Sequence, residues 1–225
     1  HPALEDIEEK PVVEPLIRAL KSDAGYPDGL ATLSETRWHR LRELFFEELA
    51  RHRTGADARP VVRNPVCTLD AGLIHRVLPE TRFVFVLRDP ADVCLSAFMQ
   101  NFGFNDMTIQ FSSIERTVWF YDQCMRAWER YRERLSLPVH TVRYEDLVED
   151  PKPQLQALLD FLQVDWDERV LDHAAGARGR RVATASYAQV IQPLHTRATR
   201  RWQRYREFLD DVWPTLSYWR DRFGY

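Results

Sequence analysis

The sequence FVFVLRDPADVCLS, residues 83–96, holds the clearest strand of the chain and the start of a helix. Residues 83–87 are apolar on both faces, which is typical of a central strand that is covered on both sides in a parallel sheet. The strand ends at Arg88, and Asp89 and Pro90 are suited to cap and begin a helix that we expect to reach about residue 102. This strand–turn–helix junction predicts an α/β fold.

Strands and helices alternate outward from this junction, with short joints between them. We expect a buried strand at residues 61–62, a further strand at 139–142, and helices over 11–20, 34–50, 68–78, 113–135, 151–162 and 199–222. This order indicates a helix-rich α/β fold with a parallel sheet flanked by helices. Ligands of such folds bind beyond the carboxyl ends of the strands.

Composition excludes several classes of protein. The chain has 225 residues, which fits a single domain over 1–225. Its 31 basic and 34 acidic residues give a net charge of −3, which disfavours nucleic acid as a partner. No apolar run approaches the ~20 residues that cross a membrane. Three widely spaced cysteines and the absence of a secretory signal favour a reducing compartment, so we expect a cytoplasmic protein with no membrane partner.

The strongest candidate site follows the strand at 83–87. Arg88 stands at its carboxyl end, the N–H groups of the next helix begin there, and Ser96 adds a hydroxyl two turns later. Arginine, hydroxyl and helix N-terminus together suit a phosphate or sulfate group. The alternative is a structural ion pair of Arg88 with Asp89 or Asp92.

Two further candidates lie earlier in the chain. Arg63 follows the expected strand at 61–62, so two cations at two strand ends could meet on one polyanion, whereas the alternative is an exposed arginine in a turn. Glu8 stands near a helix start, where a carboxylate can act as a general base toward a hydroxyl substrate. Its alternative is a solvated acidic turn.

A basic segment near the C-terminus is the last candidate. Residues 178–202 carry clustered arginines in a stretch without clear periodicity, which suits a flap over an anionic ligand. A solvated surface or a contact with RNA are the alternatives.

Three segments in this order resemble sulfotransferases that use 3′-phosphoadenosine 5′-phosphosulfate (PAPS). LRDPADVCLSAFMQNF is similar to their 3′-phosphate-binding segment, TVRYEDLVEDP to their downstream strand and helix, and TASYAQVIQPLHTRATRRWQRY to their C-terminal cofactor-covering segment. The resemblance is to bacterial sulfotransferases often joined to tetratricopeptide repeats and to tyrosylprotein sulfotransferases. It implies a P-loop-type parallel sheet and a covering segment over residues 174–202.

The resemblance also implies roles for individual residues. Arg63 would stabilise the moving sulfuryl group, and Glu8, or its neighbour Glu9, would be the general base. The residues implied to bind PAPS, or its product 3′-phosphoadenosine 5′-phosphate (PAP), are Arg88, Ser96, Tyr144, Ser186 and Arg201. No metal is implied.

The chain departs from the family pattern in three places. It begins just after the position where relatives carry a P-x-S-G-T-T loop, so we expect the first strand and the phosphosulfate loop to be missing from it. Arg63 stands where relatives commonly have lysine. Gln100 stands where tyrosylprotein sulfotransferases carry an additional arginine.

The implied reaction is in-line transfer of a sulfuryl group from PAPS to a hydroxyl on a protein tyrosine, a carbohydrate or a small molecule. The helical segment 11–50 would lie on the acceptor side, and a tetratricopeptide segment upstream is a further implied partner. The alternative function is a non-catalytic binding or scaffold domain that has lost the phosphosulfate loop.

Overall fold

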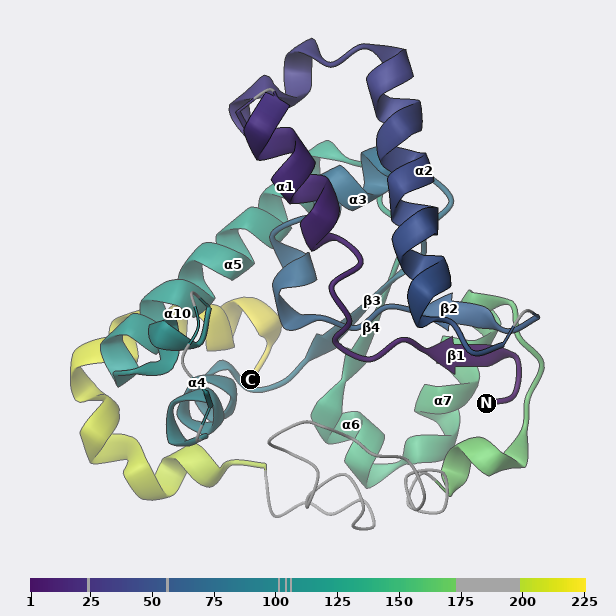
Figure 1. Ribbon diagram of the computed structural model, residues 1–225. Coiled ribbons are helices and arrows are strands. Elements are labelled where there is room, and N and C mark those ends of the chain that lie inside the picture. Colours follow the sequence, from purple (N-terminus) through teal and green to yellow (C-terminus); the bar gives the residue numbers. More distant parts are fainter. Residues whose placement is uncertain (24, 56, 101, 104, 106, 173–198) are drawn as a thin grey trace. The chain divides into compact units, whose positions relative to one another are not determined.

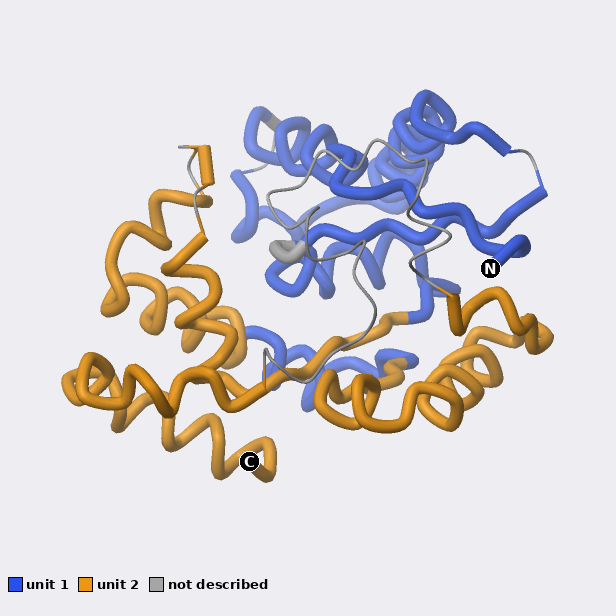
Figure 2. Tube along the Cα trace, turned by 90° about the horizontal axis from the view of Figure 1, so that it is seen from below, with its two compact units in different colours: residues 1–82, 127–138 blue, residues 83–126, 139–225 orange. Residues whose placement is uncertain are grey.

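The computed structural model describes residues 1–23, 25–55, 57–100, 102–103, 105, 107–172 and 199–225 (Figure 1). The chain divides into two compact units. Unit 1 comprises residues 1–82 and 127–138, and unit 2 comprises 83–126 and 139–225 (Figure 2). Both contain parallel strands among more numerous helices, so the expected helix-rich α/β class is confirmed.

Unit 1 pairs two short strands and packs its helices around one apolar core. Its elements are β1 (Leu4–Asp6), α1 (Glu14–Asp23), η1 (Asp28–Thr32), α2 (Glu35–His52), β2 (Arg59–Val61), η2 (Pro65–Thr68), α3 (Ala71–Val77) and the last turns of α5 (Ile114–Arg134).

The long helix α2 follows its sequence closely. The Ser34 hydroxyl accepts the Arg37 N–H at 3.2 Å and so satisfies one of the free donors at the helix start. Trp38, Leu41, Phe45 and Leu49 recur at helical spacing and are all buried. Their burial against the other helices of unit 1 stabilises α2 far more than helix propensity does.

Helices α1 and α3 begin later than the sequence predicted. Helix α1 starts at Glu14 rather than at residue 11, because Pro15, not Pro11, occupies its first turn. Helix α3 starts at Ala71 rather than at 68. The Asp70 side chain that precedes it accepts the Tyr26 hydroxyl at 2.7 Å instead of capping the helix.

The strands of unit 1 differ from the expectation. Strand β2 spans Arg59–Val61 instead of residues 61–62, and Val61 is 38% exposed, so the expectation of a buried strand was wrong. Its parallel partner β1 was not predicted, because three residues with two acids carry no strand pattern. The pairing aligns Asp6 with Val61, so both strands end at the same edge.

Unit 2 is built around a second parallel pair. Its elements are β3 (Phe83–Leu87), α4 (Pro90–Met99), η3 (Thr108–Phe111), the first turns of α5, β4 (Val139–Arg143), α6 (Tyr144–Glu149), α7 (Pro151–Leu162), η4 (Glu168–Leu171), η6 (Arg201–Val212) and α10 (Trp213–Phe223).

Strand β3 lies where the sequence predicted it, but with one face open. Leu87 is buried, whereas Val84 and Val86 on the opposite face are 39% and 63% exposed. The expectation that both faces are covered was therefore wrong for the described part of the chain. An apolar composition shows that a strand can be buried on both faces, and only tertiary packing decides whether it is.

The C-terminal elements contribute apolar residues to a core cluster of unit 2. Trp202, Leu209 and Leu216 are buried in one cluster with Ala91, Cys94 and Leu95 of α4. Elements η6 and α10 thus pack on α4, and the helix that follows Arg88 is held from its apolar side.

Candidate functional site

Arg88 and Tyr144 lie side by side at the carboxyl ends of β3 and β4. The register pairs Leu87 with Arg143, so the next residue of each strand leaves the sheet at the same edge. The guanidinium carbon of Arg88 lies 5.1 Å from the centre of the Tyr144 ring, within cation–π range. Both side chains are half-buried. The structure therefore brings Arg88 together with Tyr144, which the family resemblance placed beside the same nucleotide.

Glu145 fixes the turn that carries Arg88. Its Oε1 accepts the Asp89 N–H at 3.0 Å, and its Oε2 accepts the Tyr225 hydroxyl at 2.7 Å. Burial, together with this hydrogen bond, raises the pKa of Tyr225, so the phenol stays protonated and keeps donating. Glu145 was missed by the sequence reasoning, although it stands next to Tyr144 in the segment TVRYEDLVEDP.

The start of α4 has fewer free backbone N–H groups than the sequence suggested. Asp89 caps the helix by accepting the Ala91 N–H at 2.9 Å, which removes one of the donors expected to face an anion. The same buried carboxylate accepts the indole N–H of Trp202 at 3.0 Å and pairs with Arg220 at 3.2 Å. Asp89 is therefore engaged in packing within unit 2, and the alternative of a structural pair of Arg88 with Asp89 or Asp92 stays open.

Asp92 ties the C-terminal segment to the same helix turn. Its Oδ1 accepts the backbone N–H of Trp202 at 2.8 Å, although the carboxylate is 1% exposed. Burial raises the pKa of Asp92, while the Trp202 N–H and the charge of Arg88 oppose that rise. Trp202 is thus held by the Asp89 and Asp92 carboxylates together.

The other residues predicted for unit 2 are placed as follows. Arg201 precedes Trp202, and its Nη2 lies 3.5 Å from the Met99 sulfur at the end of α4. Ser96 is half-buried on α4. Ser186, with most of the covering segment 174–202, lies outside the described residues.

Glu8, Glu9 and Arg63 gather at the common edge of β1 and β2 in unit 1. Arg63 Nε donates to both oxygens of Asp6, at 3.0 and 3.1 Å, and its Nη1 lies 3.9 Å from a Glu9 oxygen. Glu8 has a φ of 56°, a left-handed conformation in which its N–H donates to Asp6 at 2.8 Å. These contacts fix the backbone of the turn, and the choice between a general base and a solvated acidic turn stays a prediction. Sequence reasoning missed Asp6 because β1 was not predicted.

Arg63 and Arg88 belong to different units, so their meeting around one polyanion stays a prediction. Each unit by itself presents a cation beyond the carboxyl end of a parallel strand pair, which is where ligands bind in α/β folds.

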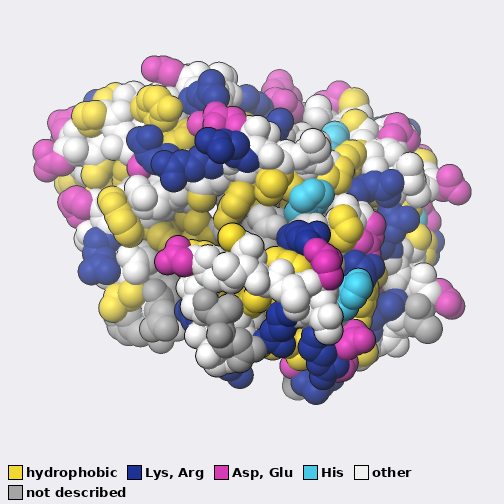
Figure 3. All heavy atoms as spheres, turned by 90° about the horizontal axis from the view of Figure 1, so that it is seen from above, with side chains coloured by type: hydrophobic (Ala, Val, Ile, Leu, Met, Phe, Trp, Pro, Cys, Tyr) yellow, Lys and Arg dark blue, Asp and Glu magenta, His cyan; other side chains and the backbone are white. Residues whose placement is uncertain are grey.

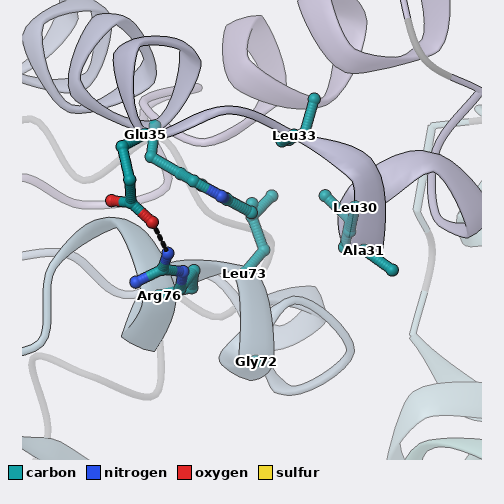
Figure 4. Close-up of a pocket in the computed structure, with 8 residues that line it drawn as sticks. Leu30, Ala31, Leu33, Glu35, Gly72, Leu73 and Arg76 are labelled. Atoms are coloured by element: carbon teal, nitrogen blue, oxygen red, sulfur yellow. Dashed lines mark hydrogen bonds and ion pairs between the residues drawn. The ribbon is translucent and has the colours of Figure 1, made fainter.

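Unit 1 also contains a pocket of about 500 Å³ between α2, η1 and α3 (Figure 4). Glu35 and Arg76 form an ion pair at 2.5 Å, and Arg76 also lies over the Trp38 ring at 5.1 Å. The remaining lining residues are Leu30, Ala31, Leu33, Gly72 and Leu73. Most of the lining comes from the segment 11–50 that the sequence assigned to the acceptor side, and that assignment stays a prediction.

Basic and acidic side chains are intermixed with apolar ones on the face drawn in Figure 3. Among the described helices, none is both long and apolar enough to span a bilayer. The described residues also contain no group of three His, Cys, Asp or Glu side chains placed to hold a metal ion.

Comparisons with known proteins point to one family. A family model described as "Sulfotransferase family" matches residues 14–168. A protein-tyrosine sulfotransferase 2 of Gallus gallus is 27% identical over 177 residues, which cover 72% of this chain and 44% of the relative. A protein-tyrosine sulfotransferase 1 of Danio rerio is 25% identical over 62% of this chain and 40% of its own length.

Two other proteins match as well. An uncharacterized protein of Aquifex aeolicus is 28% identical over 65% of this chain and 19% of its own length. A solved structure, "Sulfotransferase Domain from the Curacin Biosynthetic Pathway", is 18% identical with a TM-score of 0.49 over 82% of this chain and 64% of that one. The chain spans less than half the length of the sequence relatives described here.

Proposed function

Because this chain belongs to the sulfotransferase family, we propose that it transfers the sulfuryl group of PAPS to a hydroxyl acceptor. The protein-tyrosine sulfotransferases among its relatives favour an acceptor hydroxyl over an amine. A protein tyrosine, a carbohydrate and a small molecule all present such a hydroxyl.

The observation that carries this proposal is the pair Arg88 and Tyr144 at the carboxyl ends of β3 and β4. A guanidinium that lies over an aromatic ring is oriented before any ligand arrives, and its planar set of donors matches a phosphate. The chemistry of this pair fits an adenosine nucleotide with a 3′-phosphate. In the proposal, Arg88 and Ser96 bind that phosphate, Tyr144 lies beside the nucleotide, and Ser186 and Arg201 cover it.

The residues of unit 1 carry the chemical step in this proposal. PAPS supplies the sulfuryl group. Arg63 stabilises the negative charge that develops on oxygen during the transfer, which is the largest contribution a protein makes to reactions of this type. Glu8, or Glu9 beside it, accepts the proton of the attacking hydroxyl.

Nucleotide binding tests the Arg88 assignment. We expect calorimetry to show PAP binding by the wild-type chain and a loss of about 2–5 kcal/mol on Arg88→Ala, because a charge-assisted contact to a phosphate is removed. Arg88→Lys keeps the charge without the planar fork, so its affinity should fall in between.

Arg116→Ala is the matched control, since Arg116 is an exposed arginine of unit 2 whose Nη2 lies 3.4 Å from the side chain of Gln110. Its affinity should equal that of the wild type. An Arg88→Ala variant that binds PAP as tightly as Arg116→Ala would refute the site.

A further inference from the structure

Asp6 contacts both Arg63 and Glu8, the two residues of unit 1 to which the proposed function gives a role in the reaction. Its two carboxylate oxygens accept Arg63 Nε at 3.0 and 3.1 Å, and Oδ1 also accepts the Glu8 N–H at 2.8 Å. One side chain therefore fixes both the guanidinium of Arg63 and the backbone of Glu8.

The ion pair with Asp6 uses the Nε atom of Arg63 and not its two Nη groups. Within the described residues, its side-chain hydrogen bonds are those of Nε, and Nη1 reaches a Glu9 oxygen only at 3.9 Å. The Arg63 side chain is 45% exposed. Asp6 thus orients the guanidinium through Nε, while the Nη groups, which can present donors to an oxyanion, make no hydrogen bond to the described residues.

The turn at Glu8 depends on the same carboxylate. Ile7 is 2% exposed and its N–H donates to the Val61 carbonyl at 2.9 Å, so the chain is anchored up to that point. The next residue, Glu8, adopts a φ of 56°, which a residue other than glycine rarely does. An aspartate that accepts the N–H two residues on is a standard way to stabilise such a turn.

We propose that Asp6 is a positioning residue for the sulfuryl transfer, because it sets the directions of Arg63 and of the Glu8 turn together; this rests on the proposed function. A half-exposed ion pair adds little to stability. A displacement of about 1 Å in a reacting group, by contrast, lowers a rate by roughly 10²-fold. Asp6 should therefore influence turnover much more than folding.

Turnover of Asp6 variants tests this role. We expect Asp6→Ala to lower kcat roughly 10²-fold while the KM for PAPS and the Kd of PAP stay within about twofold, because the nucleotide is held in unit 2 and the reacting groups are displaced in unit 1. Asp6→Asn retains an oxygen that accepts the Glu8 N–H, so it should recover part of kcat.

Glu5→Gln is the matched control on the same strand. The Glu5 carboxylate accepts hydrogen bonds from Arg53, Thr54 and Gly55 in the connection to β2 and has none to Arg63 or Glu8 among the described residues. It should lower the melting temperature and leave kcat unchanged. Wild-type kcat in both Asp6 variants would overturn the positioning role.

A spectroscopic measurement separates this inference from the function it rests on. The Nε–H resonance of Arg63, assigned by its disappearance in Arg63→Lys, should shift on Asp6→Asn and not on Glu5→Gln, without any nucleotide present. If the chemical shift of that resonance is unchanged in Asp6→Asn, the inference fails. If it responds but the wild-type chain transfers no sulfate, the proposed function fails. If sulfate is transferred and Asp6 variants keep full kcat, only the positioning role fails.

Discussion

Asp89 and Asp167 both cap a helix and pair with an arginine, but they differ in burial. Asp89 is 3% exposed. Its carboxylate accepts hydrogen bonds from the Ala91 N–H and the Trp202 indole and forms an ion pair with Arg220. The side chain of Asp167 is 22% exposed. It accepts a hydrogen bond from the Arg169 N–H and forms an ion pair with the Arg169 guanidinium, and the Arg169 side chain is 71% exposed. Water can replace the partners of Asp167, whereas loss of the Asp89 carboxylate leaves donors without an acceptor inside the protein.

We expect Asp89→Ala to lower the free energy of unfolding by about 3 kcal/mol, because it removes a helix cap and one partner of a largely buried ion pair. Asp167→Ala should change it much less. Chemical denaturation of both variants measures the difference. Equal losses would show that Asp89 does not hold η6 and α10 onto α4.

The pKa of Glu5 is lowered from 4.5 to about 2, chiefly by the Thr54 backbone N–H. A carboxyl whose pKa is lower in the folded state stabilises the protein above its unfolded pKa and loses that effect as the pH falls through the folded value. We therefore expect Glu5→Gln to be less stable than the wild type at pH 7.

Thermal melts against pH give the check. The gap between wild type and Glu5→Gln should narrow between pH 4.5 and about 2. A gap that stays constant over this window would contradict the assigned cause of the shift.

The placement of some functional residues could be predicted from the sequence, and that of others could not. Arg88 follows a strand of five apolar residues, so its place at a strand end could be foreseen, whereas Tyr144 was assigned by the family resemblance. Asp6 could not be foreseen, because its position depends on the pairing of β1 with β2, which aligns Asp6 with Val61. Roles that depend on short strands or on distant pairing leave no local pattern.

Among the elements, α3 shows a close helix contact that its sequence does not reveal. A Cβ added at Gly72 would lie 2.7 Å from the Tyr131 ring, and the Tyr131 hydroxyl donates to the Leu69 carbonyl at 2.7 Å. The glycine lets the end of α5 approach α3, and the hydrogen bond limits how far the ring can withdraw.

We expect Gly72→Ala to destabilise the protein by about 1–3 kcal/mol, although alanine normally favours a helix over glycine. Denaturation midpoints measure this effect, with Gly103→Ala as control because its added methyl group meets nothing within 4 Å. Restoration of stability by Tyr131→Leu in the Gly72→Ala background would confirm the contact. A stabilising Gly72→Ala would show that α3 and α5 can shift apart.

The elements with long apolar repeats were predicted best. Helices α2, α4 and α5 and strand β3 lie within three residues of their expected ends, because each has a strong period or a cap. The open face of β3 and the short strand β1 were not predicted, since both depend on what packs or pairs beside them.

At the scale of the whole molecule, the proposed reaction needs groups from two separate pairs of strands. In the proposal, Arg88 and Tyr144 of unit 2 bind the nucleotide, and Arg63 with the carboxylates beside it in unit 1 serves the transfer. Binding and turnover should therefore respond to different variants: Arg88 governs nucleotide affinity, and Arg63 governs the rate.

Transfer of ³⁵S from labelled PAPS tests this division and the activity itself. The wild-type chain is incubated with a tyrosine peptide, a carbohydrate and a phenol, with calorimetry of PAP run in parallel on the wild type and Arg63→Ala. We predict that label reaches at least one hydroxyl acceptor and that Arg63→Ala abolishes this transfer with PAP affinity retained. Tight PAP binding with no label on any acceptor would contradict the account and leave a nucleotide-binding domain without catalysis.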